Sequence, residues 1–319
     1  MSRPRASIIL PTLDGEAHLR RLLPALARQE LAGGFELLAV DSSSDDATRE
    51  LLREAGADLL VIERADFRHG PTRNLRAAGA RGEFLVFLSQ DVEPTEPTFL
   101  EALLGAFEDP RVAGAYSRVL PRPDDDPLTR RTCLGLPEAS AEPVVRDLDH
   151  VASVRDLTPE QRADYLRFNN VASAIRHSVF REIPFPDLAF GEDFGWAARA
   201  LDAGWRIRFV PESVVWHAHA YSPREVFERY RVDAEFHRQT HGHRVRPTAL
   251  SAARGFLFEV RADLRFLAQG DGGRRESVGG YLRHAALSPW LRGAQVLGQY
   301  CGSHGWARGR DERVAGRML

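Results

Sequence analysis

The chain has 319 residues, of which 43% are hydrophobic and 28% charged, as is typical of a globular protein with a substantial core. Its formal net charge of -2 excludes binding of nucleic acid through an overall positive field, and all 43 of its Lys or Arg positions are arginine. Two cysteines far apart in sequence, Cys133 and Cys301, indicate neither a disulfide framework nor a zinc site. The first apolar run ends at Pro11, too short for a signal peptide, and no stretch of about 18 apolar residues predicts a transmembrane helix. We therefore expect a cytoplasmic protein.

Short apolar runs alternate with segments of helical periodicity in the first part of the chain. We expect strands over residues 6–10, 35–40, 59–62 and 84–88, and helices from residue 16, over 48–55 and over 72–80. Strands that alternate with helices predict an α/β protein with a parallel, doubly wound sheet. A G-x-G-x-x-G segment does not follow the first strand, so the fingerprint of a dinucleotide-binding site is missing.

Two of these strands end at an aspartate. Asp91 follows the apolar run over 84–88, and at the carboxyl end of a strand its carboxylate suits Mg²⁺ or Mn²⁺ carrying a diphosphate. The alternative is that it only caps a turn. Asp41 ends the strand over 35–40 and could accept a hydrogen bond from the N3–H of a pyrimidine base. The alternative is a helix cap, but Ser44 and Asp45 can fill that role and would leave Asp41 free.

Basic residues lie between the third strand and the helix that follows it. Arg68, His69 and Arg73, together with the helix dipole, would make a cradle for phosphate. The alternative is a basic helix end that only faces solvent. Further along, residues 121–164 are polar and poorly periodic, which indicates a loop with short helices on the acceptor side of a site.

An acidic pair precedes a helix that we expect over 194–203. Gly191 frees the backbone, so Glu192 and Asp193 lie at the helix N-terminus. There they could simply interact favourably with the helix dipole, or one of them could act as a firmly placed general base. Strands over 205–210 and 214–216 then lead to His217 and His219, which alternate on an extended segment and point to one face. Both could reach one metal ion, or one could bind it while the other packs.

The C-terminal part is predicted to be helical. Ser222 begins a helix with a capping pattern, and further helices are expected over 248–267 and 278–300, with a flexible break over 269–274 and a second break at Ser288–Pro289. These helices mix arginine with large apolar residues, which indicates packing against the rest of the chain, contact with a membrane surface, or a homodimer interface. We divide the chain into a catalytic domain over 1–220, with a nucleotide-binding part over 1–120 and an acceptor-side part over 121–220, and a helical extension over 221–319.

Several blocks, in order and over almost the whole chain, resemble a family. The sequence is similar to family 2 glycosyltransferases of the GT-A fold, and specifically to their bacterial rhamnosyltransferase branch. The blocks that carry the resemblance are SIILPTLDGEAHLRRLLPALARQ, LLAVDSSSDDATRELL, FRHGPTRNLRAAGARGEFLVFLSQDVEP, FNNVASAIRHSVF and FGEDFGWAARALDAGWRIRFVPESVVWHAHAYSPREVFERY. Two positions depart from the family pattern: Ser89 stands where D-x-D usually begins, and Leu13 stands where an aromatic residue often stacks on the base.

The resemblance implies a Rossmann-like, mostly parallel sheet and an inverting, metal-assisted transfer of a sugar, most simply L-rhamnose from dTDP-β-L-rhamnose. Carried over by position, it implies the following roles: Thr12, Asp41, His69, Arg73, Gln90 and Asp91 hold the nucleotide sugar, Asp91, His217 and His219 hold Mg²⁺ or Mn²⁺, and Asp193 is the base with Glu192 beside it.

The acceptor would be a carbohydrate, a lipid-linked sugar or a small molecule, at the inner face of the membrane if it is lipid-linked. Two alternatives remain from the sequence: the same fold using a UDP- or GDP-sugar, and a non-catalytic carbohydrate-binding protein.

Overall fold

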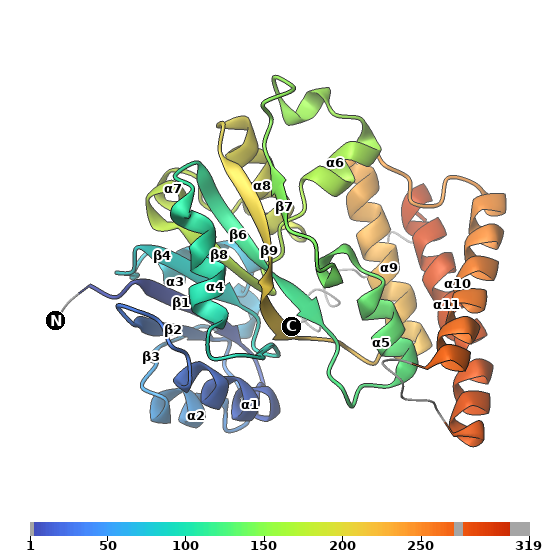
Figure 1. The fold of residues 1–319 in the computed structure, drawn as a ribbon, viewed down its shortest axis with the longest axis horizontal. Helices are drawn as coiled ribbons and strands as arrows, with labels where there is room; N and C mark the ends of the chain where they lie inside the picture. The colour runs from blue at the N-terminus through green and yellow to red at the C-terminus, as the bar shows by residue number, and fades with distance from the viewer. Residues whose placement is uncertain (1–2, 271–276, 307–319) are drawn as a thin grey trace.

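Nine strands form one sheet in the computed structural model, which describes residues 3–270 and 277–306 (Figure 1). The strands are Ala6–Thr12 (β1), Phe35–Asp41 (β2), Asp58–Val61 (β3), Phe84–Leu88 (β4), Glu93–Pro94 (β5), Val112–Leu120 (β6), Val144–Arg146 (β7), Ala172–Arg176 (β8) and Arg206–Trp216 (β9). Their order is β3-β2-β1-β4-β8-β6-β9-β5, and β7 pairs with β9. The expected α/β fold is confirmed. The sheet is mixed: β1, β2, β3 and β4 are parallel, while β8 runs antiparallel to both β4 and β6.

Helices cover both faces of this sheet, and the C-terminal helices lie beside it. They are Glu16–Ala27 (α1), Thr48–Glu54 (α2), His69–Ala77 (α3), Phe99–Leu104 (α4), Pro127–Leu134 (α5), Pro159–Tyr165 (α6), His177–Glu182 (α7), Glu192–Asp202 (α8), Pro223–Phe236 (α9), Ala249–Gln269 (α10) and Val278–His304 (α11). Side chains alternate across the strands, so Ile8 packs into the core under α1, α2 and α4, whereas Ile9 packs into the core under α3, α7 and α8. Because both faces are covered, the central strands are continuously apolar, as their sequence indicated.

The topology brings several strand ends to one edge. β6 and β9 are parallel to each other, and β8 is antiparallel to both β6 and β4, so β9 runs in the same direction as β1, β2 and β4. Thr12, Asp41, Asp91 and His217 follow or end these strands and therefore reach the same edge of the sheet. The start of β8 lies at this edge as well, because the Ser89 amide donates to the Val171 carbonyl.

The C-terminal helices form a layer beside the sheet (Figure 1). α11 packs closely on α9, because a Cβ at Gly298 would lie only 2.4 Å from the Phe227 carbonyl oxygen. The fully buried Asp263 of α10 joins α11, since its carboxylate accepts hydrogen bonds from Arg292 at 2.8 Å and from Ser288. Among the described residues, none of the helices is both long and apolar enough to cross a membrane.

Several expected boundaries differ from those observed. The break expected at Ser288–Pro289 is wrong: α11 continues through Pro289, where Ser288 and Arg292 are held by Asp263. The strands expected over 205–210 and 214–216 form one strand, β9, with an irregularity opposite Ser117 and Arg118. The capping pattern at Ser222 is confirmed. The flexible break over 269–274 lies mostly outside the described residues.

Candidate active site

Three side chains from two strand ends converge at the sheet edge. The Oδ2 atom of Asp91 lies 3.3 Å from Nε2 of His217 and 3.1 Å from Nε2 of His219, and the two Nε2 atoms are 3.1 Å apart. The second carboxylate oxygen of Asp91 is buried and has no partner among the described residues. Burial alone would raise the pKa of the Asp91 carboxyl, but the two imidazoles hold that pKa well below its ordinary range.

This triad has the donor set of a divalent-cation site. One carboxylate oxygen and two imidazole nitrogens lie within 4.8 Å of one another, and an unpartnered buried oxygen remains available. The sequence left open whether one or both histidines would face Asp91, and the structure brings both to it. The second histidine adds a nitrogen atom to this group, to which Ser89 adds no carboxylate.

The neighbourhood of the triad contains two side chains that the sequence did not single out. The ring of Tyr221 lies 5.3 Å from that of His219, and Arg122 donates to the main-chain oxygen of Asp91 at 3.2 Å. Arg122 lies in a loop after β6 and has no distinctive sequence pattern, so only the fold reveals it.

The acidic pair occupies the first turn of α8, after Gly191 in a left-handed conformation with φ 77°. The helix begins at Glu192, two residues earlier than expected. The buried Glu192 accepts hydrogen bonds from Arg73 at 3.1 Å and from Asn170 at 3.2 Å. Asp193 accepts hydrogen bonds from the main-chain amides of Phe194 at 2.9 Å and Asn170 at 3.4 Å.

These environments drive the pKa values of the two carboxyls apart. Burial opposes ionisation of Glu192, but the charge of Arg73 and then that of His69 hold its pKa below the ordinary value. Burial and the neighbouring charge of Glu192 raise the pKa of Asp193 to about 7. A carboxyl that titrates near neutral pH beside one that stays ionised is the arrangement expected when the first is a general base.

Arg73 and His69 do not form the open phosphate cradle that the sequence suggested. Arg73 is only 3% exposed, and its guanidinium points to Glu192 and to the main-chain oxygen of His69. Burial, and then the charge of Arg73, lower the pKa of His69. Arg68, the third member of the expected cradle, pairs with Asp187 at the surface. The positive charge of Arg73 is thus balanced inside the protein by Glu192, which lies 119 residues further along the sequence.

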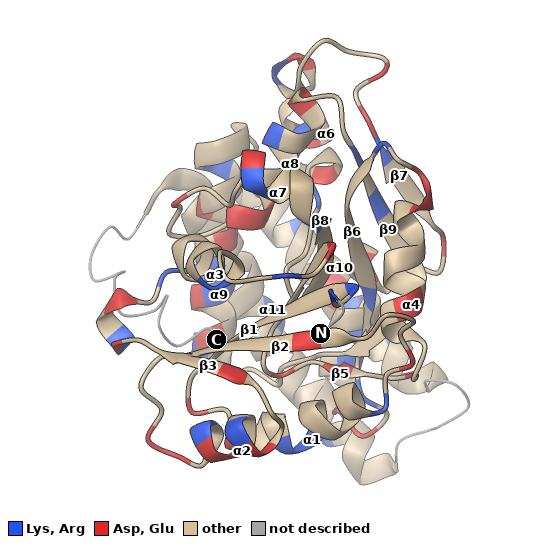
Figure 2. Cartoon of the chain, turned by 90° about the vertical axis from the view of Figure 1, so that its left-hand side faces the viewer, with Lys and Arg blue, Asp and Glu red and all other residues tan. Residues whose placement is uncertain are grey.

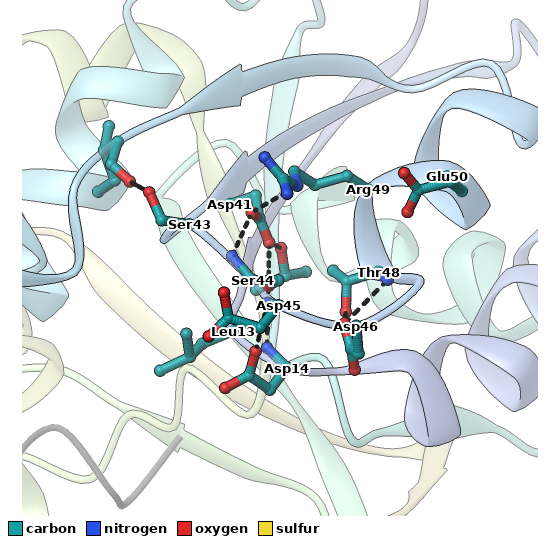
Figure 3. Close-up of polar contacts among 12 residues, drawn as sticks. Leu13, Asp14, Asp41, Ser43, Ser44, Asp45, Asp46, Thr48, Arg49 and Glu50 are labelled. Carbon is teal, nitrogen blue, oxygen red and sulfur yellow. Dashed lines mark hydrogen bonds and ion pairs between the residues drawn. The ribbon is translucent and has the colours of Figure 1, made fainter.

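Asp41 lies at the same edge but is not free, contrary to the expectation (Figure 3). Its fully buried carboxylate accepts hydrogen bonds from Thr12 at 3.0 Å, from the Ser44 amide at 2.9 Å and from the Ser44 hydroxyl. Arg49 lies 3.9 Å away. Ser44 does not cap α2 but anchors the loop to Asp41. The adjacent Ser42 hydroxyl is buried without a partner in the part of the chain that is described.

Gln90 holds the loop after β1. Its side-chain oxygen accepts from the Leu13 amide at 2.9 Å and its nitrogen donates to the Leu13 carbonyl at 3.0 Å. Both ends of the amide are thus used by the backbone, so Gln90 shapes the loop that Leu13 occupies rather than presenting a free polar group.

Asn170 links the two parts of the site. It contacts both Glu192 and Asp193, and it immediately precedes Val171, whose carbonyl pairs with Ser89 at the end of β4. Its own side-chain oxygen accepts from Ser173. The cation triad and the carboxylate pair therefore lie on either side of one strand junction.

Comparison with known proteins gives the family. The model of the family described as "Glycosyl transferase family 2" matches residues 7–156 of this chain. The chain is 32% identical to the O-antigen chain rhamnosyltransferase WbaN of Salmonella anatum over 73% of this chain and 72% of that protein. It is 30% identical to the O-antigen chain rhamnosyltransferase RfbN of Salmonella typhimurium, again over 73% and 72% of the two chains. The chain belongs to the family 2 glycosyltransferases, and it is a glycosyltransferase.

Solved structures agree with this fold. The mannosyltransferase PcManGT from Pyrobaculum calidifontis, in complex with GDP-Man and Mn²⁺, matches 96% of this chain and 88% of its own, with 18% identity and a TM-score of 0.57. Glucosyl-3-phosphoglycerate synthase from Mycobacterium tuberculosis, in complex with Mn²⁺ and UDP, matches 77% of this chain and 82% of its own, with 20% identity and a TM-score of 0.50. At these identities the likeness concerns the fold.

Proposed function

We propose that the protein is an inverting rhamnosyltransferase that moves L-rhamnose from dTDP-β-L-rhamnose to an acceptor hydroxyl. The observation that carries the proposal is the pair of adjacent carboxyls, Glu192 and Asp193, whose pKa values are shifted in opposite directions. The pair lies next to the strand-end Asp–His–His triad. The choice of sugar is supported by the relatives, which are rhamnosyltransferases of O-antigen chains at about 30% identity.

Asp193 is the general base in this proposal. It takes the proton of the acceptor hydroxyl as that oxygen attacks the anomeric carbon from the face opposite the departing diphosphate, so the configuration inverts. Glu192 is less suited to act as the base. The charge of Arg73 keeps its carboxylate ionised, and the hydrogen bonds from Arg73 and Asn170 already occupy that carboxylate. Glu192 acts instead on Asp193, whose pKa its charge raises.

Asp91, His217 and His219 would hold the divalent cation, which when bound offsets the negative charge that grows on the departing diphosphate. Two imidazole nitrogens favour Mn²⁺ over Mg²⁺, which prefers oxygen donors alone. Thr12 and Asp41, which are buried and hydrogen-bonded to each other at the ends of β1 and β2, would support the nucleotide side of the site from within.

The test is incubation of the protein with dTDP-, UDP- and GDP-sugars in the presence of Mn²⁺ or Mg²⁺, with released nucleoside diphosphate as the readout. Release from dTDP-rhamnose well above the other donors is the expected result. Preferential release from a UDP- or GDP-sugar would keep the mechanism and change the donor. If no donor is consumed with any acceptor offered, while a sugar ligand still raises the melting temperature, the protein binds carbohydrate without catalysis.

A further inference from the structure

The outward side of α10 carries an unusual combination of residues. Leu250, Arg254, Leu257, Phe258, Arg261 and Arg265 recur at helical spacing and are all exposed; we call them the outer face of α10. Leu250, Leu257 and Phe258 are 60%, 52% and 66% exposed, although large apolar side chains are usually covered. The face therefore presents apolar and positively charged side chains together.

The two acidic residues of α10 point the other way. Glu259 pairs with Arg131 of α5, and the fully buried Asp263 pairs with Arg292 of α11. The negative charges on the inner side of α10 are thus compensated by arginines of α5 and α11. On the outer face, no carboxylate of the described residues pairs with Arg254, Arg261 or Arg265. On α2 and α7, by contrast, residues of both signs are interspersed (Figure 2).

The neighbouring helix α11 continues this character. It has no Asp or Glu in its 27 residues, and Leu282, Trp290 and Leu297 are 61%, 72% and 55% exposed. Arg283 is the exposed charge beside Leu282. Both helices lie at the side of the molecule away from β1, β2 and β3 (Figure 1).

A recess opens on the outer face of α10. It has a volume of about 560 Å³, and its lining includes the charged Arg246, Arg254 and Glu259, the polar Thr248 and Ser251, and the apolar Leu250 and Phe258. Because Glu259 is paired with Arg131, the two guanidinium groups of the recess, beside Leu250 and Phe258, match a ligand with an anionic head and an apolar body.

We propose that the outer face of α10, together with the exposed side of α11, docks on an anionic lipid membrane with both helices lying in its surface. Arginines would meet lipid phosphates, and Phe258, Trp290 and the leucines would enter the boundary between headgroups and acyl chains. Neither helix crosses the membrane in this arrangement.

Charge complementarity favours this partner over a second copy of the chain. In a symmetric dimer through this face, Arg254, Arg261 and Arg265 would meet the same arginines of the other copy, and the face has no carboxylate to compensate them. A membrane rich in phosphate supplies the missing negative charge. The proposal concerns binding alone and does not depend on the identity of the donor sugar.

The experiment is co-sedimentation of the full chain with vesicles of phosphatidylcholine, with or without an equal part of phosphatidylglycerol. We expect binding only to the vesicles that contain phosphatidylglycerol, and weaker binding as salt is added. The triple variant R254Q/R261Q/R265Q should bind about 100-fold more weakly, because each arginine near an anionic surface contributes roughly a fivefold gain. The variant F258S/W290S should also lose binding, whereas Trp290→Phe should retain it.

A matched control removes three exposed arginines elsewhere, in R28Q/R53Q/R181Q, and should bind like the unmodified protein. Melting curves and donor turnover without vesicles check that each variant is folded. Equal loss in the triple variant and in this control would overturn the proposal, as would the absence of binding to phosphatidylglycerol vesicles. A dimer in solution that F258S/W290S dissociates, without any vesicle binding, would assign the face to self-association instead.

Discussion

Replacing Asp193 by asparagine separates its proposed chemical role from its structural role. The pKa of this carboxyl is raised from 3.8 to about 7, which corresponds to ~4 kcal/mol of unfavourable free energy for the ionised form in the folded protein. Folding therefore favours the protonated form of Asp193. The stabilisation that the raised pKa provides is complete below pH 3.8 and is lost as the pH rises through about 7. An asparagine has no charge to bury, and Asp193→Asn should therefore be at least as stable as the unmodified protein at pH 8.

Activity should respond in the opposite way. Loss of a general base lowers turnover by roughly 10²–10⁴-fold, while binding of the nucleotide remains nearly unchanged. In the unmodified protein, kcat/KM should rise with pH with a midpoint near 7, because the base works only when deprotonated, and Asp193→Asn should lack this rise. Release of nucleoside diphosphate at a series of pH values measures both effects. Full activity in Asp193→Asn, or a pH profile that is unchanged in it, would refute the assignment.

Glu192→Gln provides the contrasting variant. It leaves the buried charge of Arg73 without its carboxylate, and breaking such a pair costs about 3–5 kcal/mol, which denaturant unfolding would detect. It also removes the negative charge that raises the pKa of Asp193, so the midpoint of kcat/KM should move to lower pH. If Glu192→Gln were as stable as the unmodified protein and kept the same midpoint, the coupling between the two carboxyls would be wrong.

Two further predictions concern the cation and the packing of the C-terminal helices. His217→Ala and His219→Ala should each weaken Mn²⁺ binding by about 10–100-fold or more in calorimetric titration, and an unchanged affinity in both would exclude the triad as the cation site. Gly298→Ala should cost about 1–3 kcal/mol in urea unfolding, because its Cβ would lie 2.4 Å from the Phe227 carbonyl oxygen, whereas Gly279→Ala in the same helix meets nothing within 4 Å and should be neutral or slightly stabilising. Equal effects of the two alanines would contradict the close packing of α11.

The sequence was sufficient wherever the cause is local. The apolar run over 84–88, its abrupt end before Asp91, the capping residues at Ser222 and the acidic start of the helix after Gly191 all follow from neighbours along the chain. These features predicted the α/β fold and most helix and strand positions. A local pattern also misled at Pro289, where Asp263 of another helix stabilises a continuous α11.

The partners of the charged side chains were decided by tertiary structure alone. From the sequence we expected Arg73 to contact a phosphate and Asp41 to be free. In the structure, the order of the strands brings Glu192 to Arg73. The loop after β2 places Ser44 against Asp41. Burial then decides the chemistry, because a charge removed from water must take whichever partner the packing supplies. Residue types along the chain determine which groups can ionise, whereas contacts between distant segments determine at what pH they do so.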